Sequence, residues 1–119
     1  MTDKRIVFIT VPNQETAEKI ALALVEERLA ACANLIPGIT SIYHWAGKLE
    51  KSSEWLMIVK TRVDVFDDLR KRVIELHPYE VPEIVCFPIE LGFNKYLQWI
   101  DASVDSAIER KKKAPQAKQ

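Results

Sequence analysis

The chain contains little glycine or cysteine, and it has no long hydrophobic run. Its three glycines, Gly38, Gly47 and Gly92, form no cluster, which excludes a Walker A loop and a dinucleotide-binding fingerprint. The two cysteines, Cys32 and Cys86, are too far apart for a zinc motif and do not suggest the disulfide framework of a secreted protein. We expect both to be small, buried side chains.

Motifs of catalysis and of membrane targeting are also missing. There is no Gly-x-Ser-x-Gly or His-Glu-x-x-His motif, and neither cysteine has a histidine beside it. We therefore expect a protein that is not an enzyme and requires no cofactor. No apolar run approaches the roughly 18 to 20 residues that span a bilayer, and no signal peptide is recognisable. These absences predict a cytoplasmic protein with no membrane partner.

The charges are balanced over the whole chain but not along it. Residues 1–109 contain all 17 acidic residues and 12 of the 17 basic ones, a net charge of −5. The other five basic residues lie in residues 110–119. Because a negatively charged body repels a phosphate backbone, we expect no nucleic-acid partner.

Length and composition indicate one folded unit. A chain of 119 residues with 48% hydrophobic content can bury a core without disulfides or metal. We therefore assign residues 1–109 to a single domain and residues 110–119 to a basic, disordered tail.

The stretch from Asn34 to Thr61 has the alternating pattern of two long antiparallel strands. Ala46-Gly47 suits a two-residue turn, which would pair Trp45 with Lys48. Pro37-Gly38 is expected to bend or bulge the first strand without ending it. The sequence thus predicts one long β-hairpin.

This hairpin is longer than its own domain can cover. Strands of about 12 to 14 residues at roughly 3.3 Å per residue span about 40 to 46 Å. The longest helix available, Gln14 to Ala30, measures about 25 Å. An exposed apolar edge must find cover, so we predict that other copies of the chain provide it. The expected interface residues are Ile42, Tyr43, Trp45, Leu49 and Trp55.

The first half of the chain outside the hairpin predicts a strand and a helix. Arg5 to Val11 is a short, β-branched run typical of a buried strand. Asn13 is a suitable N-cap for the helix from Gln14 to Ala30. Its apolar face is formed by Ala17, Ile20, Ala21, Leu24, Val25 and Leu29.

The second half predicts a helix, a strand and a final helix. Asp64 is expected to cap the first of these helices, which ends before Pro78. Glu83 to Leu91 is expected to be a strand, and because Pro88 cannot donate to a ladder, the strand belongs at a sheet edge or carries a bulge. The final helix begins after Gly92 and Asn94. Its expected apolar stripe is Leu97, Ile100, Val104 and Ile108.

The order of these elements predicts an α+β fold of ferredoxin-like βαββαβ type. The long hairpin joins its second and third strands, and an extra helix follows the last strand. With right-handed crossovers the sheet is antiparallel, in the order fourth, first, third and second strand.

Two stretches of the chain are distinctive: LAACANLIPGITSIYHWAGKLE (residues 29–50) and HPYEVPE (residues 77–83). They resemble the divalent-cation tolerance protein family CutA, and the resemblance extends from Ile6 to Val104. It implies a homotrimer assembled through the hairpins, with an architecture like that of PII signalling proteins, and a role in tolerance of copper and other divalent cations.

The resemblance also implies a metal site of one cysteine and two histidines. Their positions fall on Ile9, Leu76 and His77 here, so only His77 is a possible ligand. Copper and zinc prefer several nitrogen or sulfur donors. We therefore expect at most weak binding of copper or another divalent cation.

The candidate site is a cleft between subunits near the residues that follow the second helix. His77, Glu80 and Glu83 offer one nitrogen and two carboxylates to a cation. In the alternative interpretation, His77 only ends the helix and its neighbours shape the turn. The expected cleft residues for a small ligand are Tyr43, Trp45, Lys60 and Tyr79.

Two further functions stay open. The chain could be a PII-like nucleotide or metabolite sensor, in which Tyr43, Trp45 and Trp55 stack on a base. Lys60 and Arg62 would then bind its phosphate. It could also be a structural scaffold without a metal function.

Overall fold

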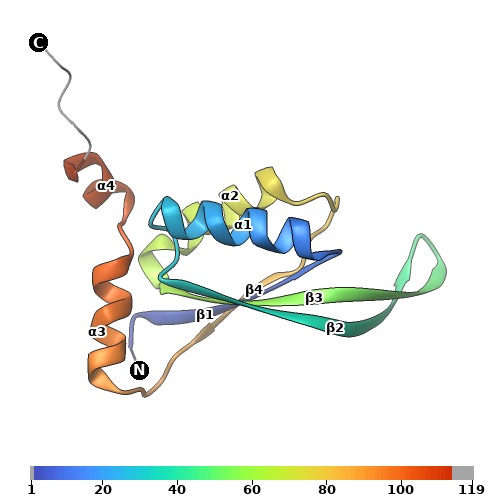
Figure 1. The fold of residues 1–119 in the computed structure, drawn as a ribbon, viewed down its shortest axis with the longest axis horizontal. Coiled ribbons are helices and arrows are strands. Elements are labelled where there is room, and N and C mark those ends of the chain that lie inside the picture. The colour runs from blue at the N-terminus through green and yellow to red at the C-terminus, as the bar shows by residue number, and fades with distance from the viewer. Residues whose placement is uncertain (1, 114–119) are drawn as a thin grey trace, which may run out of the picture.

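The computed structural model describes residues 2–113 and has the predicted α+β, ferredoxin-like order (Figure 1). All neighbouring strands are antiparallel, and the sheet order is β2-β3-β1-β4, as predicted. The elements are β1 (Lys4–Val11), α1 (Gln14–Glu26), β2 (Cys32–Trp45), β3 (Lys48–Arg62), the 3₁₀ turn η1 (Val63–Val65), α2 (Phe66–Leu76), β4 (Ile84–Pro88), α3 (Asn94–Ser103) and α4 (Ala107–Lys113).

The core lies between the sheet and the two helices α1 and α2, which lie together on one face of it (Figure 1). Strand residues alternate between the two faces, so Val7, Ile9 and Val11 point into this core and are fully buried. Ile9 is thus a core side chain. From α1, Ile20 and Leu24 complete the same layer.

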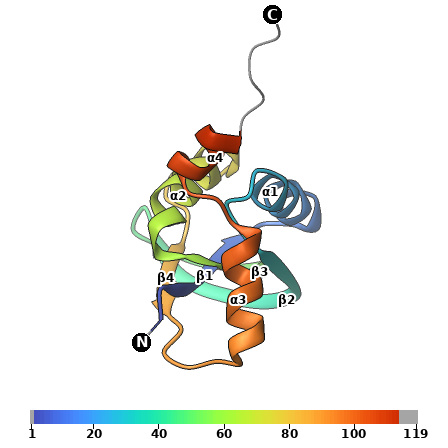
Figure 2. The same cartoon turned by 90° about the vertical axis from the view of Figure 1, so that its left-hand side faces the viewer.

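The other face of the sheet has much less cover. Phe8 packs edge-on against Phe87, with ring centroids 5.0 Å apart, and Val85 and Phe87 are exposed there. Helix α3 crosses only the end of the sheet that is far from the hairpin tip (Figures 1 and 2). Cys32 and Cys86 are free thiols on opposite edge strands, and both are half-buried.

The hairpin has the predicted turn, pairing and bulge. Trp45 pairs with Lys48, and Ala46 and Gly47 both have positive φ (52° and 78°), which gives the tight turn its twist. The register shifts between Ile36 and Ile39, where Gly38 has φ 77°.

The hairpin tip extends beyond the ends of α1 and α2 (Figure 1). Ile42 and Leu49, on its two strands, are 66% and 69% exposed. Trp55 differs from these two residues, because it is partly buried against the protomer's own core. The exposed apolar surface is therefore concentrated in the outer half of the hairpin.

The first helix is shorter than predicted. It ends at Glu26 instead of Ala30, because Arg28 adopts a left-handed conformation (φ 61°) that turns the chain. The amides of Leu29 and Ala30 both donate to the carbonyl of Leu24. Their side chains are still buried, which explains why the apolar spacing continued past the end of the helix.

The prediction that Asp64 caps the second helix was wrong. Helix α2 starts at Phe66, after η1, and its N-cap residue Val65 makes no side-chain capping bond. The Asp64 carboxylate instead binds the guanidinium of Arg62 through two contacts of 3.0 Å. Because Arg62 is only 6% exposed, leaving its charge unpaired would cost more free energy than leaving the helix without a side-chain cap.

The predicted final helix is two helices. The backbone is extended at Val104 (φ −115°, ψ 149°), and the next amide, of Asp105, donates to the carbonyl of Arg28. Ser106 and Glu109 then form a reciprocal capping box that starts α4. Ile108 lies on α4 and is 69% exposed, so it is not part of the α3 stripe.

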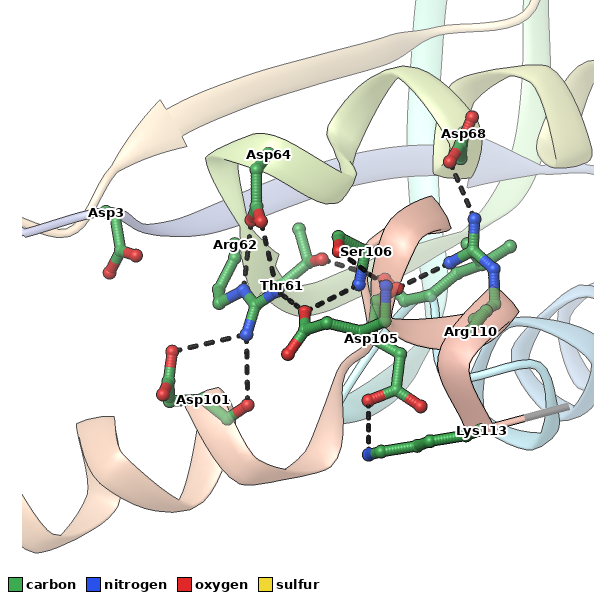
Figure 3. Close-up of polar contacts among 12 residues, drawn as sticks. Asp3, Thr61, Arg62, Asp64, Asp68, Asp101, Asp105, Ser106, Arg110 and Lys113 are labelled. Carbon is green, nitrogen blue, oxygen red and sulfur yellow. Dashed lines mark hydrogen bonds and ion pairs between the residues drawn. The ribbon is translucent and has the colours of Figure 1, made fainter.

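Helix α4 includes residues 110–113, which we expected to belong to the tail, so residue 109 is not a structural boundary. Ion pairs hold the helix to the body: Arg62 with Glu109, Arg110 with Asp68, and Lys113 with Asp105 (Figure 3). Residues 114–119 of the expected tail lie outside the described residues.

Candidate functional site

A groove of about 710 Å³ lies beside the outer half of the hairpin. One side is formed by β2 and β3 of the hairpin, and the other by the loop that joins α2 to β4. Its volume falls within the range of small-molecule sites. The lining residues are Thr10, Ser41, Ile42, Tyr43, Trp45, Glu54, Pro78, Tyr79, Glu80, Val81 and Glu83.

His77 lies at the start of the loop that lines this groove and is hydrogen-bonded through both ring nitrogens. It is 8% exposed, and its Nδ1 accepts a hydrogen bond of 3.1 Å from the amide of Tyr79. Nε2 must therefore carry the proton, which it donates to the carbonyl of Thr10 at 2.7 Å. Both ring nitrogens have partners, so metal binding through His77 stays a prediction that requires one of these bonds to break.

Tyr79 and Glu54 form the main polar contact inside the groove. The Tyr79 hydroxyl donates to Oε2 of Glu54 at 2.6 Å, and Glu54 is only 5% exposed. Burial and the adjacent carboxylate raise the pKa of Tyr79 well above its ordinary value. The hydroxyl consequently remains a donor at any physiological pH.

The groove is acidic and aromatic. It contains the carboxylates of Glu54, Glu80 and Glu83, and none of its lining residues is basic. The rings of Tyr43, Trp45 and Tyr79 also line it. Among residues 2–113, no three His, Cys, Asp or Glu side chains are close enough to hold a metal ion. The protomer alone therefore does not provide the ligand set that copper or zinc prefers.

The two basic residues expected to bind a phosphate have other partners. Lys60 is not a lining residue of the groove, and its ammonium group donates to the side chain of Asn34. Arg62 binds Asp64, Asp101 and Glu109 at the other end of β3 (Figure 3). The structure thus does not bring these cations together with Tyr43 and Trp45.

Of the eleven residues that line the groove, five were named from the sequence as contacts of the ligand or the cation, and Glu54 was not among them. The five are Tyr43, Trp45, Tyr79, Glu80 and Glu83. The signal for Glu54 was present, because a carboxylate placed directly before the apolar run Trp55–Val59 enters a buried strand. It needed a buried partner, and Tyr79 is that partner.

The four-stranded antiparallel sheet with α1 and α2 on one face and a long β2-β3 hairpin defines a ferredoxin-like protein of PII-like architecture. Residues 5–103 match the family model described as CutA1 divalent ion tolerance protein. Because this match covers most of the chain, the protein belongs to the CutA1 family.

Individual relatives agree with this assignment. The divalent-cation tolerance protein CutA of Thermus thermophilus is 54% identical over 97 residues, which cover 82% of this chain and 94% of that protein. A solved structure of the divalent cation tolerance protein from the same species, with a TM-score of 0.84 and 51% identity, covers 86% of this chain and 99% of the solved one.

A plant relative is longer than this chain. The protein named "Protein CutA, chloroplastic" from Arabidopsis thaliana is 46% identical over 98 residues, which cover 82% of this chain but just over half (54%) of the relative.

Within residues 2–113, no helix has both the length and the apolar character needed to cross a membrane.

Proposed function

We propose that the protein acts in tolerance of divalent cations, copper among them, as a cytoplasmic homotrimer that binds a cation or small ligand in clefts between its subunits. It would require no cofactor and no nucleic-acid or membrane partner. The names of its relatives support the cation-tolerance role. The observation that carries the assembly is the exposed apolar outer half of the hairpin.

Assembly follows from the energetics of that outer half. Exposed side chains there include Ile42, Tyr43, Trp45 and Leu49. Fully burying one exposed large apolar side chain contributes about 1.5–3 kcal/mol, and these side chains, which are 41% to 69% exposed, would each contribute part of that. In a trimer with threefold rotational symmetry, each subunit would bury its hairpin against one neighbour and cover the hairpin of the other, so that no copy is left exposed.

The same hairpin connects assembly to ligand binding. Ile42, Tyr43 and Trp45 line the groove and also belong to the predicted interface. A neighbouring copy seated on them would convert an open groove into a closed cleft. Its three carboxylates favour a positively charged ligand over an anionic nucleotide.

The assembly is tested by light scattering coupled to size-exclusion chromatography. Wild-type protein at micromolar concentration is expected to elute as a trimer, and Leu49→Glu as a smaller species. Ile108→Glu is the matched control, because Ile108 has the same 69% exposure but lies on α4, far from the hairpin. A folded wild-type monomer would overturn the proposal.

A further inference from the structure

The groove does not have the geometry of a metal site. Glu54, Glu80 and Glu83 line one cavity, yet among the described residues no three such groups converge on a point. A cavity of about 710 Å³ is also far larger than an ion needs. These observations indicate a ligand with positive charges separated along its length.

The walls of the groove suit organic ammonium ions, such as protonated aliphatic amines. Electron-rich faces of Tyr and Trp attract organic cations, most strongly where water is excluded. Tyr43, Trp45 and Tyr79 line the groove, as do the apolar side chains of Ile42 and Val81. Methylene groups of a flexible amine would contact such walls, which a hydrated metal ion cannot do.

Glu54 provides an anchor inside the groove. It is 5% exposed, and its Oε2 accepts from Tyr79. Within residues 2–113, no hydrogen bond reaches its other oxygen, Oε1, and no solvent-excluded side-chain oxygen lacks a partner, so Oε1 is accessible to solvent. An accessible acceptor on a mostly buried carboxylate binds an ammonium group more strongly than a fully exposed carboxylate does. Glu80 and Glu83 are exposed and can bind a second ammonium group nearer to solvent.

We propose that the groove binds a linear organic polycation of the aliphatic di- or triamine class. One ammonium group lies at Glu54 beside the aromatic rings, and another lies at Glu80 and Glu83. The inference rests on the groove being the ligand site of the proposed function, and it names the class of ligand. It differs from that function in expecting an amine in place of a bare metal ion.

The test is isothermal titration calorimetry of the full chain at physiological salt, with the triamine spermidine as the probe. Spermidine is expected to bind, and the monoamine n-butylamine, Mg²⁺ and ATP to bind more than about tenfold more weakly. Glu80→Gln with Glu83→Gln should lower spermidine affinity about tenfold or more. Glu50→Gln with Glu90→Gln is the control, since it makes the same charge change at two exposed positions outside the groove.

Two results would overturn the inference. One is no binding of spermidine at about 1 mM, a concentration that detects even weak sites. The other is an equal loss of affinity in both double variants, which would indicate attraction by net charge only. Light scattering on the same samples separates the two proposals: a trimer that ignores amines refutes only the ligand class, and a monomer that binds them refutes only the assembly.

Discussion

Replacing Tyr79 with phenylalanine tests the central contact of the groove. The change removes one oxygen and leaves the ring in place. That oxygen donates at 2.6 Å to Glu54, a carboxylate with 5% exposure. In the Tyr79→Phe protein, the described residues no longer provide Glu54 with a side-chain donor.

The expected cost follows from the charge and burial of the pair. A hydrogen bond to a charged group contributes about 1.5–3 kcal/mol. Tyr79 is itself 36% exposed, so water can partly replace its hydroxyl, and we expect the free energy of unfolding to fall by about 1–2 kcal/mol. For a chain of this size, each kcal/mol lowers the Tm by roughly 3–6 °C. Thermal unfolding must be measured at one fixed protein concentration, because assembly also raises the Tm.

Tyr43→Phe is the matched control for this measurement. The Tyr43 hydroxyl lies 3.1 Å from Oγ of Ser52, and both groups are neutral, so its loss should change stability by less than about 0.5 kcal/mol. Glu54→Gln in the Tyr79→Phe background should recover part of the loss, because an unpaired amide costs less than an unpaired carboxylate. Equal effects of the two Tyr→Phe changes would refute the reasoning.

The pH dependence of the same pair has a definite sign. Burial and then Glu54 raise the pKa of Tyr79 above its ordinary 10.0, so the folded state holds the phenolic proton when the unfolded chain has lost it. The stability that this provides is complete below pH 10 and declines as the pH rises beyond it. The alkaline decline should be smaller in Tyr79→Phe.

Three further changes have expected results. Ala46→Asn should raise the free energy of urea unfolding by about 0.5–1 kcal/mol, because Asn tolerates the positive φ of the Ala46-Gly47 turn better than Ala does. The hydrogen bond from the Ser106 amide, followed in size by the one from Arg62, lowers the pKa of Glu109 to about 2. Helix α4 should therefore stay docked above pH 4.5 and loosen as the pH falls toward 2. NMR shifts of the α4 amides would report this loosening, and the pH dependence should be absent from Glu109→Gln. His77→Ala should lower the free energy of unfolding by about 1–3 kcal/mol, because two hydrogen bonds are lost. In calorimetry of the same variant, a tenfold loss of Cu(II) affinity would support His77 as a metal ligand.

The hairpin could be predicted because its signals are local. Each strand alternates over many residues, and a two-residue turn with glycine second allows only one close pairing of the flanking residues. Strand order then followed from right-handed connections between few elements. None of these steps requires knowledge of which side chains meet across the fold.

The helix ends could not be predicted because they depend on which side chains the fold buries. Asp64 has the residue type of an N-cap, but it lies two positions from a buried Arg62 and binds that charge instead. Leu29 keeps the helical spacing although the helix has ended, because the turn at Arg28 returns it to the core. The Ser106 to Glu109 capping box was visible in the sequence, but the helical stripe through Ile108 hid it.

The site shows the same limit. His77 was a reasonable metal ligand by residue type, but its Nε2 binds the carbonyl of Thr10, a residue 67 positions away in the chain. That contact depends on the fold, since it needs the start of the α2-β4 loop to lie against the end of β1. Residue type therefore predicted which segment forms the groove, and tertiary contacts decided which atoms are free within it.

The contacts of Arg62 indicate how α4 relates to the family fold. Its charge is nearly buried, so it must be paired, and Asp64 and Asp101 already bind it from within the family match of residues 5–103. Glu109 lies outside that match and adds a third carboxylate (Figure 3). Removing α4 would thus leave Arg62 paired and the core intact, because none of the described residues of α4 is buried. Helix α4 therefore docks through Glu109 onto an arginine that the family fold already holds in place. Protonation of Glu109 at low pH should weaken this docking while the rest of the domain remains folded.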